Sequence, residues 1–202
     1  MNLSSRADST SQDGQNIISI IKAIYPLTTN KIIVPANFKC AAVVIPLVNV
    51  NNVLNMLLTK RTESVRDHQN QVSFPGGVCE ESDNSLLETA VREFEEEIGV
   101  KLALNTVIGG MLPRKTITGY FIAPFIVTLA AETKMHPNPL EVQKVIKVPI
   151  SWLDNHNNYS SKPYQRNGLA EDYVIFYEPF EGEVIWGITA QIIRDFLDGI
   201  KK

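Results

Sequence analysis

Three glutamates at helical spacing, Glu93, Glu96 and Glu97, carry the clearest chemical signal in this sequence. An α-helix places them within an arc of about 100° on one face, opposite an apolar stripe. Most charge runs form a solvated surface, but like charges three and four residues apart destabilise a helix by about 0.2–0.5 kcal/mol per pair. Carboxylates that converge without basic partners suit Mg²⁺, which prefers oxygen ligands and substrate phosphates. We therefore interpret these glutamates as a divalent cation site and as candidate catalytic residues.

Two glycines, Gly76 and Gly77, precede this acidic segment. Glycines permit a sharp turn or a close approach of the backbone to a ligand, and the Gly77 carbonyl could supply another metal ligand. A Gly-Gly pair alone usually marks only a turn. The pair together with a carboxylate-faced helix points to a phosphate-binding site, so both glycines are candidate substrate-binding residues.

A basic group, Arg61, Arg66 and His68, stands ahead of the glycines. Arginine forms charge-assisted, bidentate hydrogen bonds with phosphates, and we interpret the group as substrate-binding. The alternative is that these side chains brace the loop by hydrogen bonds. A single histidine is more often structural than catalytic.

The helix that must position the glutamates is expected from about Asn84 to Ile98, with Gly99 placed to end it. Its apolar stripe consists of Leu87, Ala90 or Val91, Phe94 and Ile98. Runs rich in Val, Ile and Phe predict strands, with helical patterns at both ends of the chain. The expected strands are 39–48, 54–61, 106–112, 120–130 and 142–148, with a late hairpin of 173–177 and 183–186. The expected helices are 17–25, a short one after Pro149, and a last one capped by Thr189 with an apolar face of Ile192, Ile193, Phe196, Leu197 and Ile200.

This order predicts a mixed α/β (α+β) fold without regular βαβ alternation. Residues 1–16 are polar and aperiodic, which indicates a disordered leader before a single domain of residues 17–202. A hydrophobic share of 44% excludes a mainly disordered chain. A net charge of -3 argues against nucleic acid as a partner. No apolar run approaches the about 20 residues of a membrane helix, and no secretion signal is visible.

The two cysteines, Cys40 and Cys79, cannot form a disulfide framework, and we expect free thiols in a reducing compartment. Because no targeting signal is visible, the cytoplasm is the expected location. The oligomeric state does not follow from the sequence.

The segment from Gly77 to Val100 resembles the Nudix box of the Nudix hydrolases, and its core matches in full from Arg92 to Val100. The resemblance implies a Nudix fold, a mixed β-sheet sandwiched between helices, and a metal-dependent hydrolase that cleaves a diphosphate. It assigns Glu93 and Glu97 as first ligands of Mg²⁺ or Mn²⁺, and Glu96 as a further ligand or base.

The resemblance also implies roles for the residues around the box. Arg92 would orient the carboxylates through ion pairs, with Glu88 or Glu96 at helical spacing. Asp83 stands where the family commonly has Glu, one residue farther from Arg92 than usual. Glu141 is either another carboxylate of the site or an exposed loop residue.

The segment from Leu57 to Gly77 is similar to the leader of one branch of this family, the coenzyme A diphosphatases. This resemblance implies cleavage of coenzyme A or acyl-CoA, small-molecule substrates, to 3′,5′-ADP and (acyl-)4′-phosphopantetheine. The matching positions are Leu57, Leu58, Thr59, Arg61, Arg66, His68, Gln71, Val72 and Phe74 to Gly77, while Thr62, Val65 and Asn70 depart from the pattern. Two alternatives stay open: a diphosphatase for ADP-ribose or another nucleoside diphosphate derivative, and a Nudix module that binds a nucleotide without cleaving it.

Overall fold

The computed structural model describes residues 16–27, 33–63, 70–164 and 172–201. Within these ranges eight strands form one sheet, in which β1 and β7 are parallel and the other pairs are antiparallel. The strands are β1 (Lys39–Val50), β2 (Val53–Arg61), β3 (Val72–Ser73), β4 (Gly76–Val78), β5 (Val107–Gly110), β6 (Arg114–Lys115), β7 (Tyr120–Leu129) and β8 (Val142–Pro149).

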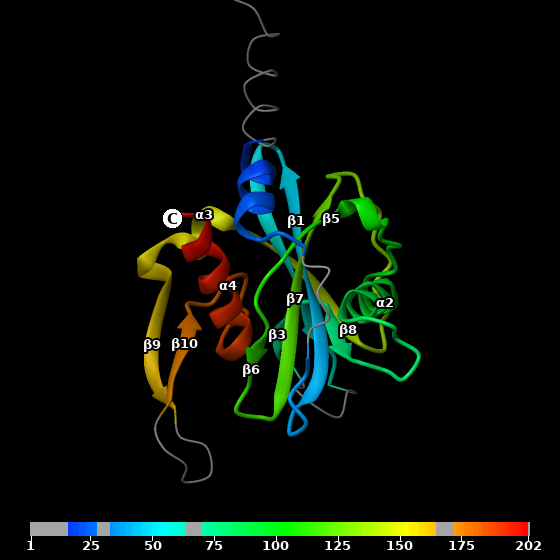
Figure 1. The fold of residues 1–202 in the computed structure, drawn as a ribbon. Coiled ribbons are helices and arrows are strands. Elements are labelled where there is room, and N and C mark those ends of the chain that lie inside the picture. Colours follow the sequence, from blue (N-terminus) through cyan, green and yellow to red (C-terminus); the bar gives the residue numbers. More distant parts are fainter. Residues whose placement is uncertain (1–15, 28–32, 64–69, 165–171, 202) are drawn as a thin grey trace, which may run out of the picture.

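Helices cover both faces of this sheet (Figure 1). Alternate residues of β1 point to opposite sides: Ala42 and Val44 pack with α2 (Leu86–Ile98), whereas Ile45 and Leu47 pack with α4 (Gly187–Ile200). The other elements are an N-terminal helix (16–24), α3 (Ile150–Asp154), the short turns η1 (Leu104–Thr106) and η2 (His156–Asn158), and a two-stranded sheet of β9 (Tyr159–Tyr164) and β10 (Asp172–Tyr177). The predicted mixed sheet between helices is confirmed.

The sheet joins the residues of the site because β1 pairs along one edge with both β2 and β4. β2 also pairs with β8, so that Arg61 at the end of β2 lies opposite Val142, next to Glu141. α2 packs across β1 and β4. The end of β2, the glycines of β4, the acidic helix and the start of β8 therefore converge.

The predicted N-terminal helix is confirmed, but the face that helical spacing predicts for Ile17, Ile20, Ile21 and Ile24 is not buried as a whole. Ile21 is fully buried, whereas Ile20 and Ile24 are exposed. The Tyr25 hydroxyl donates to two backbone carbonyls of α4, and its ring stacks on Phe196. Packing against α4 thus sets the orientation of this helix.

Two details at the C-terminal end were predicted wrongly. The predicted partner of β10 was 183–186, but the strand that pairs along β10 is β9. Of the predicted hairpin, the bridges Phe176–Trp186 and Phe180–Glu183 and the hydrogen bond from the Tyr177 N–H to the Ile185 carbonyl are present. Serine, lysine and proline in β9 give it little strand character. Thr189 is not the cap of α4, because the helix begins at Gly187 and buries Thr189 inside it.

The prediction of free thiols is wrong, because Cys40 and Cys79 form a disulfide. The antiparallel pairing of β1 and β4 sets Ala41 opposite Val78, and this pairing also brings the two cysteines, at the next positions, together with their Cα atoms 5.4 Å apart. Thirty-nine positions separate them in the sequence, so that only the fold reveals the pair.

Across the described residues, no helix is both long and apolar enough to cross a membrane. The predicted leader, residues 1–16, lies outside the described ranges except for Asn16, with which the first helix begins.

Candidate active site

The acidic helix α2 is fixed at both ends. The Ser85 hydroxyl caps its N-terminus by accepting the Glu88 N–H, and Gly99, with a positive φ of 69°, ends it. Ala90, Phe94 and Ile98 are fully buried under the sheet. This packing fixes the rotation of the helix and thereby the direction of its glutamates.

Glu97 does not lie on a solvated face, because only 1% of it is exposed. Its Oε1 accepts a hydrogen bond of 3.0 Å from Arg61 Nη1. Its Oε2 is buried and has no hydrogen-bond partner among the residues that the structure describes. Burial raises the pKa of Glu97 to about 8, with smaller contributions from Glu93 and Glu141, although Arg61 opposes the rise.

Glu93 lies against the glycine strand β4. A Cβ atom at Gly77 would collide with the Glu93 carboxylate and displace it, so the glycine permits this close approach. Arg92 Nη1 donates to Glu93 Oε1 at 2.9 Å. Burial raises the pKa of Glu93 despite this contact, and the charges of Glu96 and Glu141 add to the rise.

Glu96 occupies the rim of the site. Half of its side chain is exposed, and its Oε2 accepts from Arg92 Nη1 at 3.2 Å. The expectation that the three glutamates lack basic partners is therefore wrong: Arg61 pairs with Glu97, and Arg92 pairs with Glu93 and Glu96.

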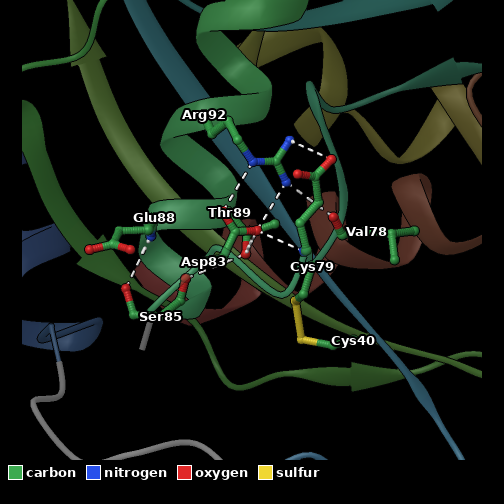
Figure 2. Close-up of a disulfide and its surroundings, with 9 residues drawn as sticks. Cys40, Val78, Cys79, Asp83, Ser85, Glu88, Thr89 and Arg92 are labelled. Carbon is green, nitrogen blue, oxygen red and sulfur yellow. Dashed lines mark hydrogen bonds and ion pairs between the residues drawn. A yellow bond between two sulfur atoms is a disulfide. The ribbon is translucent and has the colours of Figure 1, made fainter.

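Arg92 orients the acidic cluster, as predicted, but its main partner is Asp83 (Figure 2). Asp83 accepts from Arg92 Nε and Nη2 at 3.0 Å each, and from the buried Thr89 hydroxyl at 2.9 Å. The hydrogen bonds from Arg92 lower the pKa of Asp83 to about 2. The predicted alternative partner, Glu88, instead accepts hydrogen bonds from Asn84 at the start of the helix.

Glu141 belongs to the same electrostatic environment, because its charge contributes to the raised pKa values of Glu93 and Glu97. Its Oε1 accepts from Asn138 Nδ2 at 3.0 Å, and the Asn138 backbone N–H donates to the Glu97 carbonyl at 3.0 Å. This turn before β8, which is bonded to the last turn of α2, thus holds a fourth carboxylate close to the site. The sequence alone did not separate this position from an exposed loop.

Of the predicted substrate-binding residues, Arg61, Gly76 and Gly77 lie beside the glutamates. The Gly76 backbone N–H favours the charged form of Glu97 and so partly offsets the rise in its pKa. Arg61 Nε is buried without a hydrogen-bond partner within the described ranges. Arg66 and His68 lie outside the described residues.

A divalent cation fits the chemistry of this cluster, although no ready cage of three or more acidic, histidine or cysteine side chains exists among the described residues. Glu97 Oε2 is a buried carboxylate oxygen that lacks a hydrogen-bond donor within the described part of the chain, which suits a metal ligand. The raised pKa values of Glu93 and Glu97 reflect two carboxylates removed from water, and a nearby cation would stabilise both as anions.

Comparison with known proteins agrees with these observations. Residues 38–171 match the model of the NUDIX domain. The chain is 32% identical over 165 residues to "Uncharacterized Nudix hydrolase NudL" of Photorhabdus laumondii, covering 82% of this chain and 87% of the relative. The protein of the same name from Yersinia pestis is 33% identical over 154 residues, 76% of each chain.

A solved structure, a MutT/nudix family protein from Enterococcus faecalis, has the same fold. It superposes with a TM-score of 0.56 at 14% identity, over 86% of this chain and 66% of that one. The chain therefore belongs to the Nudix hydrolase family and is an enzyme that acts on pyrophosphate bonds.

Proposed function

We propose that this enzyme cleaves the diphosphate of coenzyme A or acyl-CoA to 3′,5′-ADP and (acyl-)4′-phosphopantetheine. The observation that carries the proposal is the hydrogen bond from Arg61 to Glu97. It joins the segment that resembles the coenzyme A diphosphatases to the box that carries the chemistry. The backbone N–H of Arg61 also bonds to the Gln71 carbonyl, so both ends of the stretch that contains Arg66 and His68 are anchored together.

Nudix hydrolases generally use divalent metal ions such as Mg²⁺ or Mn²⁺. Here Glu93 and Glu97 would hold the cation, and Glu96 is a further ligand or the base. The bound ion would supply a more acidic water molecule and would neutralise charge on the phosphoryl oxygens.

The chain itself supplies orientation. Arg92 holds Glu93 and Glu96 through one nitrogen, Nη1, while Asp83 fixes the other side of the guanidinium. This arrangement keeps the two carboxylates in place before substrate arrives. Glu96 is the candidate proton acceptor for the attacking water, because its half-exposed side chain can pass the proton to solvent.

Recognition of the substrate would depend on the basic group. Arg61 already lies beside the glutamates, and its buried Nε has no hydrogen-bond partner among the described residues. Arg66 and His68 would meet the 3′-phosphate that distinguishes coenzyme A from most nucleoside diphosphate derivatives, because arginine forms charge-assisted hydrogen bonds with phosphate.

The test is a hydrolysis screen with Mg²⁺ or Mn²⁺ in which products are identified by mass spectrometry. Coenzyme A, an acyl-CoA, ADP-ribose and a nucleoside triphosphate are compared at equal concentrations. We expect 3′,5′-ADP and the matching phosphopantetheine as the fastest-formed products. Faster cleavage of ADP-ribose would assign the enzyme to another substrate class, and tight binding without cleavage of any compound would indicate a non-catalytic module.

A further inference from the structure

β4 is the least supported strand of the site. It has three residues, two of them glycines, and it pairs with β1 along one edge only, as far as the described residues show. Glycine adds no side-chain packing to a strand and leaves it weak. The disulfide from Cys79 to Cys40 joins the residue directly after β4 to the neighbouring strand by a covalent bond.

Val78 and the loop after β4 lie against Arg92 and Asp83, the pair that supports the acidic cluster (Figure 2). Gly77 lies against the Glu93 carboxylate, and the Val78 carbonyl accepts from Arg92 Nη2 at 3.2 Å. One residue beyond Cys79, the Glu80 N–H donates to Asp83 at 2.9 Å. Movement of this segment would therefore disturb Glu93 both directly and through the Asp83–Arg92 pair.

The disulfide is within reach of solvent, because both cysteines are only partly buried. A thiolate can attack either sulfur, forming a mixed disulfide and releasing the other cysteine as a thiolate. A second thiol molecule then resolves the mixed disulfide. The net change is two cysteine thiols in the protein and one disulfide of the small molecule.

We propose that Cys40–Cys79 is a thiol-exchange site through which small-molecule thiols weaken cation binding at Glu93 and Glu97. In the oxidised protein the disulfide holds β4 against β1 and keeps Gly77 and Val78 in place. In the reduced protein noncovalent contacts alone hold this segment, among them the backbone hydrogen bond from the Cys79 N–H to the Cys40 carbonyl at 3.0 Å. The inference rests on the cation site of the proposed function and does not depend on the identity of the substrate.

The direct test is the affinity for Mn²⁺, measured by calorimetry on the metal-free protein in its oxidised and glutathione-reduced forms. Glutathione is removed before titration, and alkylation with mass spectrometry counts the free cysteines. We expect the reduced form to bind Mn²⁺ about tenfold more weakly, because loss of a group that supports metal ligands typically costs 10- to 100-fold in affinity. Reoxidation should restore the affinity.

The matched control is the double variant Cys40→Ser/Cys79→Ser, checked for folding by circular dichroism. It should bind Mn²⁺ as weakly as the reduced enzyme and should not respond to glutathione. Equal Mn²⁺ affinity in the oxidised and reduced wild-type proteins would overturn the proposal, and this comparison holds even if the double variant does not fold. Free thiols in the protein after oxidation would overturn it as well.

Turnover of an acyl-CoA, which has no free thiol, separates this inference from the proposed function. Cleavage that does not respond to glutathione would contradict the exchange site and leave the function standing. A redox-dependent Mn²⁺ affinity without cleavage of acyl-CoA would support the exchange site and contradict the proposed function. If neither form binds Mn²⁺, both the cation site and the inference fail.

Discussion

Arg61 Nη1 lies 3.0 Å from Glu97 Oε1, which joins the last residue of β2 to the last turn of α2. Glu97 is almost fully buried, and its second oxygen has no hydrogen-bond partner within the described ranges. A buried carboxylate of this kind costs stability unless a cation compensates its charge. Its burial therefore favours a role in the chemistry over a role in folding.

Replacement of Glu97 by Gln tests this interpretation. Gln keeps the shape but removes the charge, so turnover should fall by about 100-fold or more, because the charge of a metal ligand is lost. The melting temperature of the metal-free protein should stay the same or rise. Steady-state kinetics and calorimetry measure the two effects.

Glu95→Gln is the matched control, since Glu95 is an exposed residue of the same helix. It should retain normal turnover. Near-normal kcat in the Glu97 variant would show that Glu97 has no catalytic function.

Metal removal gives a second prediction. Because the buried Glu97 and the partly buried Glu93 have raised pKa values and Glu97 has an oxygen without a hydrogen-bond partner among the described residues, we expect a divalent cation to be required. Turnover should vanish in excess EDTA and return when Mg²⁺ or Mn²⁺ is added beyond the chelator. Full activity after exhaustive chelation would exclude the metal-dependent mechanism.

The pH dependence of stability follows from Glu97. Burial raises its pKa from 4.5 to about 8, so the folded, metal-free protein holds this proton more tightly than the unfolded chain. The resulting stabilisation is complete below about pH 4.5 and is lost as the pH rises through about 8. The melting temperature in chelator should therefore fall over this range.

The Glu97→Gln variant should lack this part of the pH dependence, because it has no group to titrate at that position. The measurement is the melting temperature of the wild-type protein and the variant in chelator, from about pH 4.5 to about pH 8. If the melting temperatures of the two proteins changed in parallel with pH, the pH dependence would come from a group other than Glu97.

The local features of the site could be predicted from the sequence, because they depend on short spacings. The periodicity of α2 and its end at Gly99 follow from helical geometry. The resemblance to the Nudix box implied that Arg92 orients the carboxylates. The burial of Glu97 could not be predicted, since it depends on Arg61 from a strand 36 positions earlier.

The same distinction explains the errors in the fold. The disulfide of Cys40 and Cys79 depends on the pairing of β1 with β4, and no local pattern encodes that pairing. The partner of β10 was missed because the sequence of β9 has a weak strand pattern. Tertiary contacts set the position of β9 beside β10.

Asp83 gives a prediction about the support of the cluster. Asp83→Asn loses the charge that accepts two hydrogen bonds from Arg92, in a side chain that is 6% exposed. We expect a loss of about 1–3 kcal/mol in the free energy of unfolding, measured with urea at neutral pH. Turnover should fall as well, because Arg92 would no longer hold Glu93 in place.

Glu80→Gln is the matched control, because the Glu80 carboxylate is largely exposed and lies 3.9 Å from Arg92. Its effect on stability should stay within about 0.5 kcal/mol. If Asp83→Asn behaves like this control, the pair with Arg92 does not support the site.

The measurement that tests the central claim most directly is the ratio of kcat/KM for coenzyme A and dephospho-CoA, which differ only in the 3′-phosphate. One charged contact to that phosphate is worth about 1.5–3 kcal/mol, so we expect coenzyme A to be preferred by about 10- to 150-fold. Arg66→Ala should narrow this ratio, while Lys22→Ala, an exposed lysine on the N-terminal helix, should leave it unchanged. Equal efficiency on both compounds, or better turnover of ADP-ribose than of either, would contradict the assignment to coenzyme A.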